Sequence, residues 1–439
     1  MGMINKWQAT FIGLGNIIGA GIFVLAGTAI SDAGPGAIIA FIITAVLALT
    51  IALNSAELSS KIVSHGGLYS FTKVTMGESA GFVVGWLRAI SYAIAASAVA
   101  IGFGSYILSF VNLPYIYILL LAAILIVIAA AIDYKGIGTV ARVEHILVFI
   151  TIGGLVLFII ISIFYGHWTM PRFTPFIPSR PMNIIEAASL AFFAYSGFNT
   201  IATLGPETED PERSIPFAIL VALAVSTVLY IVIIFGMLAL MPFKYYGITG
   251  NPLFNALVFA HAPVAVEYTI NIVAIIATFT VTISLIVAGS RTLLQMSEDR
   301  LLPAWIQGRK KDSPRRATLL IAALAIASLF IGNLQVIALA SNFGVIFSYS
   351  LTGLAVVILR KRRVNGKFKS PLYPFVQILS IALSALIMFA LGERAFYIGT
   401  ITILVGFMLY FVEKEDIFGK TRKTGKEREE PKGGITPSD

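Results

Sequence analysis

The chain has 439 residues, of which 58% are hydrophobic and 12% are charged, and its formal net charge at pH 7 is +9. A soluble chain of this length needs more charge on its surface than this. The chain has no cysteine, which excludes disulfides, thiolate metal sites and a cysteine nucleophile. Long apolar segments recur throughout, which predicts an all-α, multi-pass protein of the cytoplasmic membrane.

Twelve apolar segments are each long enough to cross a bilayer, at roughly 20 residues per span. In chain order the predicted spans are 8–31, 36–60, 80–111, 115–132, 143–165, 184–204, 215–241, 264–297, 317–331, 334–359, 373–391 and 395–413. We treat 1–413 as one transmembrane domain. The charged stretch 414–439 that follows it predicts a disordered cytoplasmic tail.

Lysine and arginine are unequally distributed between the two sides of this arrangement. With the N-terminus inside, four of the 31 Lys and Arg lie outside, Arg88 lies within a span and the remaining 26 lie inside; the outer four are Arg172, Arg180, Lys244 and Arg394. The positive-inside rule then predicts that both termini are cytoplasmic. The basic charge is thus a topology signal, and we expect no nucleic-acid partner.

The first predicted span contains the triplet Gly19-Ala20-Gly21 near its middle, within "GLGNIIGAGIFVLAG". Glycine is a poor helix former, so this triplet predicts an interrupted helix. Unwound backbone is tolerated at membrane depth only where it faces a polar cavity. The alternative is that these glycines are points of close helix packing.

The sixth predicted span, 184–204, has a similar weak point at Ser196-Gly197, followed by Asn199. Spans one and six are equivalent helices in an inverted repeat of five plus five. Two interrupted helices in equivalent positions indicate a transporter binding site. The N-terminus of a half-helix attracts a carboxylate, and the C-terminus attracts an ammonium group or a cation.

Several motifs resemble those of the amino acid–polyamine–organocation (APC) superfamily of transporters. They are "IIGAGIF" (17–23), "AGPGA" (33–37), "SHGGLYSF" (64–71), "FFAYSGFNT" (192–200), "GPETEDPERSIP" (205–216) and "SRTLLQMSEDRLLP" (290–303). The resemblance implies a LeuT-like core of two inverted repeats, about 8–165 and 184–359, followed by two extra helices in 373–413. It also implies secondary transport of amino acids, by symport or exchange, through alternating access.

The resemblance further implies which groups contact the substrate. The substrate carboxylate is expected at the backbone N–H groups of Gly19, Ala20 and Gly21, and the amino group at the carbonyls of Ile17, Phe193 and Ser196. Asn199 is a further expected substrate contact. Phe193 is expected to act as an aromatic gate over the substrate; packing in an apolar helix is the alternative for this side chain.

Two neutral residues stand where members of the superfamily carry ionisable groups. Thr151 occupies the position of a lysine that many proton-coupled members have in helix 5, and Asn199 that of an acid found in some exchangers. A proton relay through either position is therefore excluded.

Sodium is one candidate for the coupling ion, because hard cations prefer oxygen ligands. The ligands implied by sodium-coupled relatives are Gly15, Ile18, Thr151, Ala277 and Thr280. Exchange without an ion and proton coupling elsewhere stay open, since threonine hydroxyls commonly bond their own helix.

No Asp or Glu falls in the inferred pocket, so a cationic side chain would lack a buried partner. The sequence therefore favours a neutral amino acid, with the small apolar stretches 93–100 and 282–289 facing it; a carbonyl cage or Asn342 is the alternative, which would serve a polar side chain. Transport of polyamines or cationic amino acids, and an amino-acid sensor without transport, are the alternatives. We find no catalytic set of an enzyme, no ATP-binding loop and no cofactor motif. The expected partners are the amino acid and the bilayer, with the protein a monomer or a homodimer.

Two further ionisable residues lie in or near spans. Glu57 has Lys61 four residues later, which predicts an exposed ion pair at the inner end of the second span. Arg88 lies about a turn or two into the third span, and we expect it to extend toward the inner surface.

Overall fold

The computed structural model describes residues 3–64, 66–109, 111, 113–135, 140–307 and 315–429, without the side chains of 20, 135, 140–145 and 413–429. Helices make up almost all of this part of the chain. The one β-bridge outside them in the described ranges is parallel and joins Ile4 to Thr208. The all-α fold predicted from the sequence is therefore confirmed.

Most of the α-helices follow the predicted spans in chain order, apart from two short ones at Leu68–Met76 and Pro252–Phe259, which lie between spans. The α-helices are α1 (Lys6–Ile17), α2 (Ala20–Ala33), α3 (Ala37–Lys61), α4 (Leu68–Met76), α5 (Glu78–Ile107), α6 (Tyr115–Lys135), α7 (Val140–Tyr165), α8 (Met182–Tyr195), α9 (Pro211–Leu240), α10 (Pro252–Phe259), α11 (Val264–Glu298), α12 (Arg315–Ser328), α13 (Leu334–Lys361), α14 (Phe375–Phe389) and α15 (Glu393–Glu429). Short 3-10 helices are η1 (Gly34–Gly36), η3 (Met170–Arg172), η5 (Phe243–Tyr245) and η6 (Ala304–Gln307), and the longer η4 covers Ser196–Glu207.

Nine stretches of the described chain are long and apolar enough to cross a membrane. One of them, Gly21–Lys61, joins α2 to α3 through η1, and α14 is apolar but shorter than these nine. The chain is thus a multi-pass membrane protein. Twelve spans and the division into two inverted repeats stay predictions.

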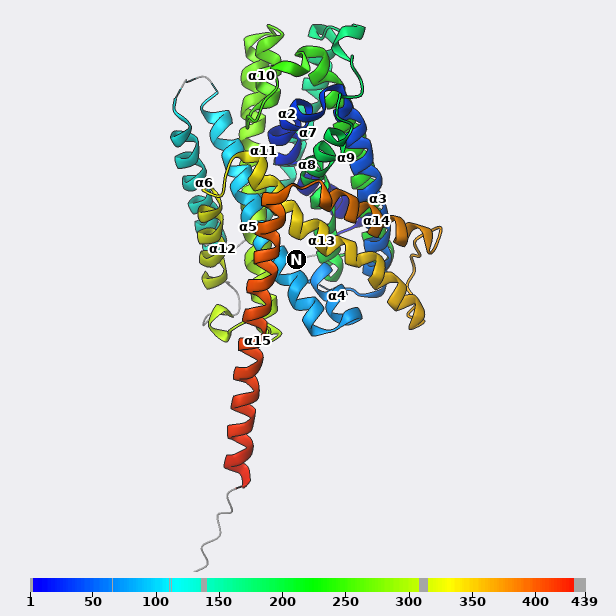
Figure 1. The fold of residues 1–439 in the computed structure, drawn as a ribbon, viewed down its shortest axis with the longest axis vertical. Helices are drawn as coiled ribbons and strands as arrows, with labels where there is room; N and C mark the ends of the chain where they lie inside the picture. Colours follow the sequence, from blue (N-terminus) through cyan, green and yellow to red (C-terminus); the bar gives the residue numbers. More distant parts are fainter. Residues whose placement is uncertain are drawn as a thin grey trace, which may run out of the picture.

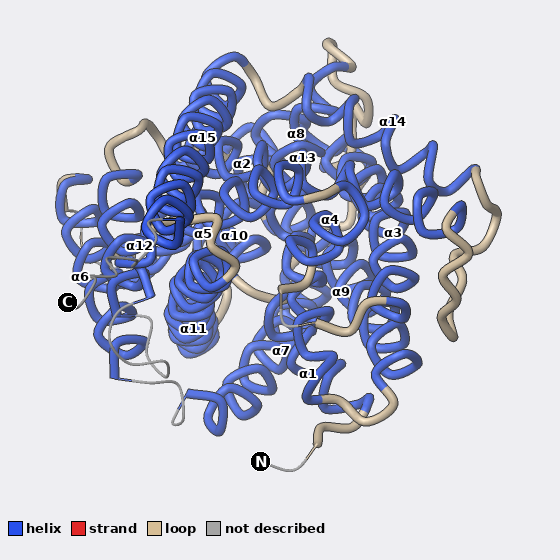
Figure 2. Tube along the Cα trace, turned by 90° about the horizontal axis from the view of Figure 1, so that it is seen from below, coloured by secondary structure: helices blue, strands red, loops and turns tan. Residues whose placement is uncertain are grey.

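The helices form a bundle in which α5 packs along both α11 and α13, while α2 packs on α8 and α3 on α9. Figure 1 shows α2 and α10 toward one end of the bundle and α4 at the other, where α15 extends beyond the remaining helices. In Figure 2, which looks along the bundle from that end, α6 and α12 lie on one side and α3 and α14 on the opposite side. We call the end with α4 the N-terminal face, because α1 begins on that side of the interruption.

Both interruptions predicted from the sequence are present, in different forms. The helix that starts as α1 ends at Ile17, Ile18 and Gly19 leave helical geometry, and α2 begins at Ala20. In the sixth predicted span the α-helix ends at Tyr195 and continues as the 3-10 helix η4 for 12 residues. A 3-10 run of this length is uncommon and typical of a functional hinge.

The halves of the two interrupted helices on the N-terminal face are joined by backbone. The N–H of Ile4 donates to the carbonyl of Glu207 at 2.9 Å, and the N–H of Glu209 donates to the carbonyl of Ile4 at 2.9 Å. The start of α1 is therefore fastened to the end of η4.

Glu57 pairs with Lys61 as predicted, but the pair is buried, so the prediction that it is exposed is wrong. Its carboxylate is 0% exposed and accepts from Lys61 Nζ at 2.6 Å, from Arg360 at 2.8 and 2.6 Å, and from the backbone N–H of Ser370 at 2.8 Å. The sequence could not show this, because Arg360 and Ser370 are about 300 residues away and cover the carboxylate only in the folded chain.

Candidate functional site

The two helix interruptions meet at a small cavity of about 70 Å³. Gly19 and Gly21 line it from the first interruption, and Phe193, Ser196 and Gly197 line it from the second. The volume is far below that of pockets for drug-sized ligands, which favours a ligand of only a few heavy atoms.

The glycines of the two interruptions also allow the two chain segments to pack closely. A Cβ atom at Gly21 would lie 2.2 Å from Cα of Ala194, and one at Gly197 would lie 2.1 Å from the carbonyl oxygen of Asn16. These are contacts with backbone, which cannot move aside. Close helix packing and a helix interruption that faces a cavity are therefore not alternatives here, because the same glycines take part in both.

The start of α2 is the electropositive part of the cavity wall. Gly19 is the N-cap residue and has no side chain to cap the helix. The first amides of a helix, here at Ala20 and Gly21, have no acceptor within it and carry a partial positive charge. The N–H of Gly19 itself already donates to Ile17 at 2.8 Å. Of the three predicted amides, those of Ala20 and Gly21 are therefore the ones left for a carboxylate, and this contact stays a prediction.

Each of the three carbonyls predicted for the substrate amino group accepts a hydroxyl. The carbonyl of Ile17 accepts from Tyr230 at 2.6 Å, that of Phe193 from Ser196 Oγ at 3.0 Å and that of Ser196 from Tyr349 at 2.7 Å. A carbonyl has two lone pairs. The carbonyl of Ile17 also accepts from the N–H of Gly19, and the carbonyl of Ser196 lies at the start of η4, where the 3-10 pattern gives it the N–H of Asn199.

Phe193 lines the cavity as expected, and two predicted polar contacts do not. Asn199 is buried outside the cavity lining. Asn342 also lies outside it, and its Nδ2 donates to the carbonyl of Ser189 at 2.7 Å. Of the stretches expected to face the substrate, 282–289 contributes as predicted. From 93–100 only Ala95 lines the cavity, and the other lining residues of α5, Arg88, Ser91 and Tyr92, come before that stretch.

Arg88 is a residue of the cavity lining whose position was predicted wrongly from the sequence. It does not extend to the N-terminal surface: it is 6% exposed and lines the cavity. Its guanidinium lies over the rings of Tyr92 and Tyr349, at 4.4 and 5.2 Å from their centroids. The sequence does contain a signal for this position, because a lone charged residue inside an apolar span indicates a functional site.

The predicted cation ligands lie on helices that surround the first interruption. Gly15 faces Val148 on α7, one turn from Thr151, and Gly19 faces Val281 on α11, next to Thr280. The hydroxyls of Thr151 and Thr280 donate to the carbonyls of Leu147 and Ile276, both at 2.9 Å. A hydroxyl that donates in this way keeps its lone pairs, so these bonds leave a cation site open as a prediction.

Ile18 and Ala277 are both buried. The described residues hold no group of three or more His, Asp or Glu side chains that could bind a metal ion.

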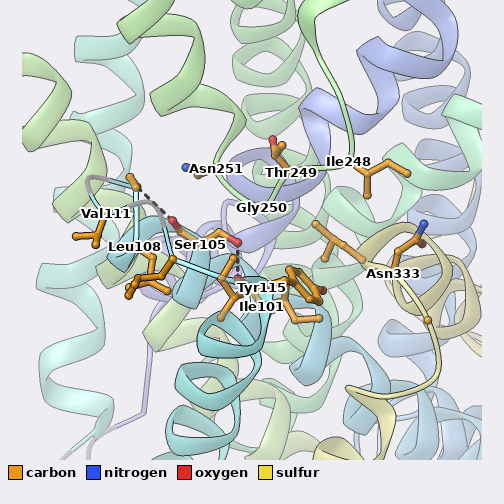
Figure 3. Close-up of a pocket in the computed structure, with 15 residues that line it drawn as sticks. Ile101, Ser105, Leu108, Val111, Tyr115, Ile248, Thr249, Gly250, Asn251 and Asn333 are labelled. Atoms are coloured by element: carbon orange, nitrogen blue, oxygen red, sulfur yellow. Dashed lines mark hydrogen bonds between the residues drawn. The ribbon is translucent and has the colours of Figure 1, made fainter.

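A second, larger pocket of about 760 Å³ opens toward the opposite face. Figure 3 shows Ser105 of α5 and Leu108, which follows that helix, on one side of it, with Thr249, Gly250 and Asn251 of the α9–α10 connection on the other. Its lining is uncharged. Because α5 runs from this pocket to the central cavity, the helix lines both spaces.

Comparison with known proteins gives a consistent result. The model of the family described as amino acid permease matches residues 8–421. The methylthioribose transporter of Bacillus subtilis is 33% identical, over 93% of this chain and 92% of its own length. The branched-chain amino acid permease of the same organism is 30% identical, with the same coverage. Cationic amino acid transporter 5 of Arabidopsis thaliana is 26% identical, over 90% of this chain and 71% of its own length.

Proposed function

Because this chain belongs to the amino acid permease family, we propose that it is a secondary transporter that moves small amino acids across the cytoplasmic membrane by alternating access. It acts without chemical conversion of the substrate, and its N-terminal face is the cytoplasmic one. The excess of Lys and Arg on that face supports this orientation.

One observation carries the proposal: the cavity lies where the two interrupted helices meet. The amides at the start of α2 provide positive partial charge, and the carbonyl oxygens of Phe193 and Ser196, which lie where α8 changes to η4, provide negative partial charge. These opposite charges suit the carboxylate and the ammonium group that every amino acid carries. When the substrate binds, its ammonium group takes the place of the hydroxyls that now donate to these carbonyls.

A neutral side chain fits this cavity better than a cationic one. The described residues that line it include no Asp or Glu, and an unpaired buried charge is costly. Branched-chain amino acids, named for one relative, belong to the neutral class. The methylthioribose transporter favours a second candidate, a small solute that is not an amino acid.

Sodium, exchange and protons are the three coupling modes to be separated. For sodium we propose the oxygens near the first interruption, at Gly15, Ile18, Thr151, Ala277 and Thr280. The contacts of α1 and α2 with Val148 and Val281 support this choice, because they bring α7 and α11 to the interruption.

The test is ligand binding by thermal shift of the purified protein in detergent, across the twenty amino acids and methylthioribose, with and without sodium. A ligand that binds the folded state raises the melting temperature by mass action. Stabilisation by neutral amino acids supports the proposal, and a response to methylthioribose alone favours the second candidate. A shift that grows with sodium supports the cation site. Uptake into proteoliposomes then separates transport from a sensor that only binds.

A further inference from the structure

Arg88 is a buried cation on the side of the cavity toward the N-terminal face. It lies on α5, and Ser91, Tyr92 and Ala95 continue the same wall. One Nη atom donates to the hydroxyl of Tyr92, and the guanidinium lies over the rings of Tyr92 and Tyr349. Aromatic faces attract a cation, so the two tyrosines offset part of the desolvation cost and hold the group in place.

Arg88 has no carboxylate partner in the described part of the chain. The ion pairs found there involve other residues. The helices that line the cavity carry acids only near their ends, at Asp32, Glu78, Glu186, Glu207, Glu267 and Glu298. On α5 itself, Glu78 is ten residues before Arg88, about 15 Å along the helix axis. A permanent positive charge therefore faces the cavity without an acid of the protein beside it.

A guanidinium has five N–H donors, and its pKa is too high for it to lose its charge. The hydroxyls of Tyr92 and Tyr349 accept hydrogen bonds from Arg88 and their rings lie against it, so the remaining N–H groups of the guanidinium are the ones that need a further acceptor. Buried charges are stable only when paired and hydrogen-bonded. The missing partner is an anionic oxygen, and the space from which it can reach Arg88 is the cavity.

We propose that Arg88 selects the charge of the substrate side chain. It admits neutral side chains, binds a side-chain carboxylate by charge-assisted hydrogen bonds, and rejects a cationic side chain by repulsion. This inference rests on the proposed function and deepens it, because the amides of α2 hold the α-carboxylate and Arg88 acts on the side chain. The accepted class then extends from neutral to acidic amino acids.

The test compares ligands that differ in charge and little in shape. Apparent Kd values are measured by thermal shift for aspartate against asparagine and for lysine against norleucine, with wild-type protein and Arg88→Gln. We expect wild type to bind aspartate at least about tenfold more tightly than asparagine, and lysine at least about tenfold more weakly than norleucine. In Arg88→Gln both ratios fall toward one. Arg88→Lys, which keeps the charge, retains the direction of both.

The outcomes distinguish this inference from the proposed function. If norleucine or asparagine binds wild type but neither ratio departs from one, Arg88 is not the selector and amino-acid binding stands. Ratios that are unchanged in a folded Arg88→Gln protein lead to the same conclusion. If no amino acid binds wild type, the proposed function fails and this inference fails with it. The wild-type ligand pairs decide the question even if Arg88→Gln does not fold.

Discussion

The hydroxyl of Tyr230 donates to the carbonyl of Ile17 at 2.6 Å and so closes the last turn of α1 with a side chain from α9. The same hydroxyl lies 3.1 Å from the carbonyl of Ala194, near the end of α8. One phenol thus contacts both interrupted helices just before each leaves α-helical geometry.

We expect Tyr230→Phe to lower the free energy of unfolding by about 0.5–1.5 kcal/mol, since it removes a buried hydrogen bond from the hydroxyl to the carbonyl of Ile17. Substrate binding should weaken as well, because Ile17 lines the cavity. The control is Tyr246→Phe, which removes a bond of 2.7 Å to the Met237 carbonyl away from the cavity. The melting temperatures and the apparent Kd values for substrate are measured for both variants and compared with those of the wild-type protein. Equal binding losses in the two would contradict a local role for Tyr230.

Gly197→Ala should be strongly destabilising, by about 1–3 kcal/mol or more, because its Cβ would overlap the backbone of Asn16. Gly153 on α7 is the matched control, since a Cβ there meets no atom within 4 Å. Gly153→Ala should be neutral or stabilise by about 0.5–1 kcal/mol. Thermal unfolding in one detergent compares the two. Similar melting temperatures would mean that the two interruptions are not packed as closely as described.

Gly19→Ala should weaken binding through a steric overlap that a second substitution can remove. Its Cβ would lie 2.4 Å from Cγ2 of Val281, a side-chain atom. We expect at least about tenfold weaker binding in the single variant and recovery of most of it in Gly19→Ala/Val281→Ala, because the second change removes the overlap. The measurement is a double-mutant cycle of apparent Kd values. A double variant as weak as Gly19→Ala would show that the loss has another origin than this overlap.

Glu57→Gln should cost about 3–5 kcal/mol, because it leaves Lys61 and Arg360 next to a neutral group in a buried setting. Asp210→Asn is the control, as the Asp210–Lys367 pair is also short, at 2.7 Å, but its side chains are 46% and 45% exposed. An exposed pair contributes less than about 1 kcal/mol. Unfolding midpoints of both variants at low and high salt test this. Comparable losses in the two would contradict a special role for the buried carboxylate.

The sequence predicted those features of the fold and the site that depend on local composition. Apolar length marked the helices, and the Gly19-Ala20-Gly21 triplet marked the first interruption within two residues. Ser196 marked the point at which α8 changes to η4. Backbone geometry of this kind follows from a few neighbouring residues, so a sequence can show it.

The errors concern side chains whose surroundings come from distant parts of the chain. Arg88 faces inward because Tyr349, which is 261 residues later, lies under it, and no local pattern encodes that contact. Glu57 is covered by Arg360 and Ser370 for the same reason. An arginine can extend to a membrane surface or stack on tyrosine, and only packing decides between the two.

The 3-10 geometry of η4 makes this segment longer than an α-helix of the same residues. Its 12 residues span about 24 Å at 2.0 Å per residue, whereas an α-helix of the same residues spans about 18 Å. Rewinding would therefore shorten it by about 6 Å while every residue stays helical. Because Ile4 is bonded to Glu207 and Glu209, α1 would be drawn along with it. The two half-helices on the N-terminal face are thus joined, and a change in the pitch of η4 would move both of them together.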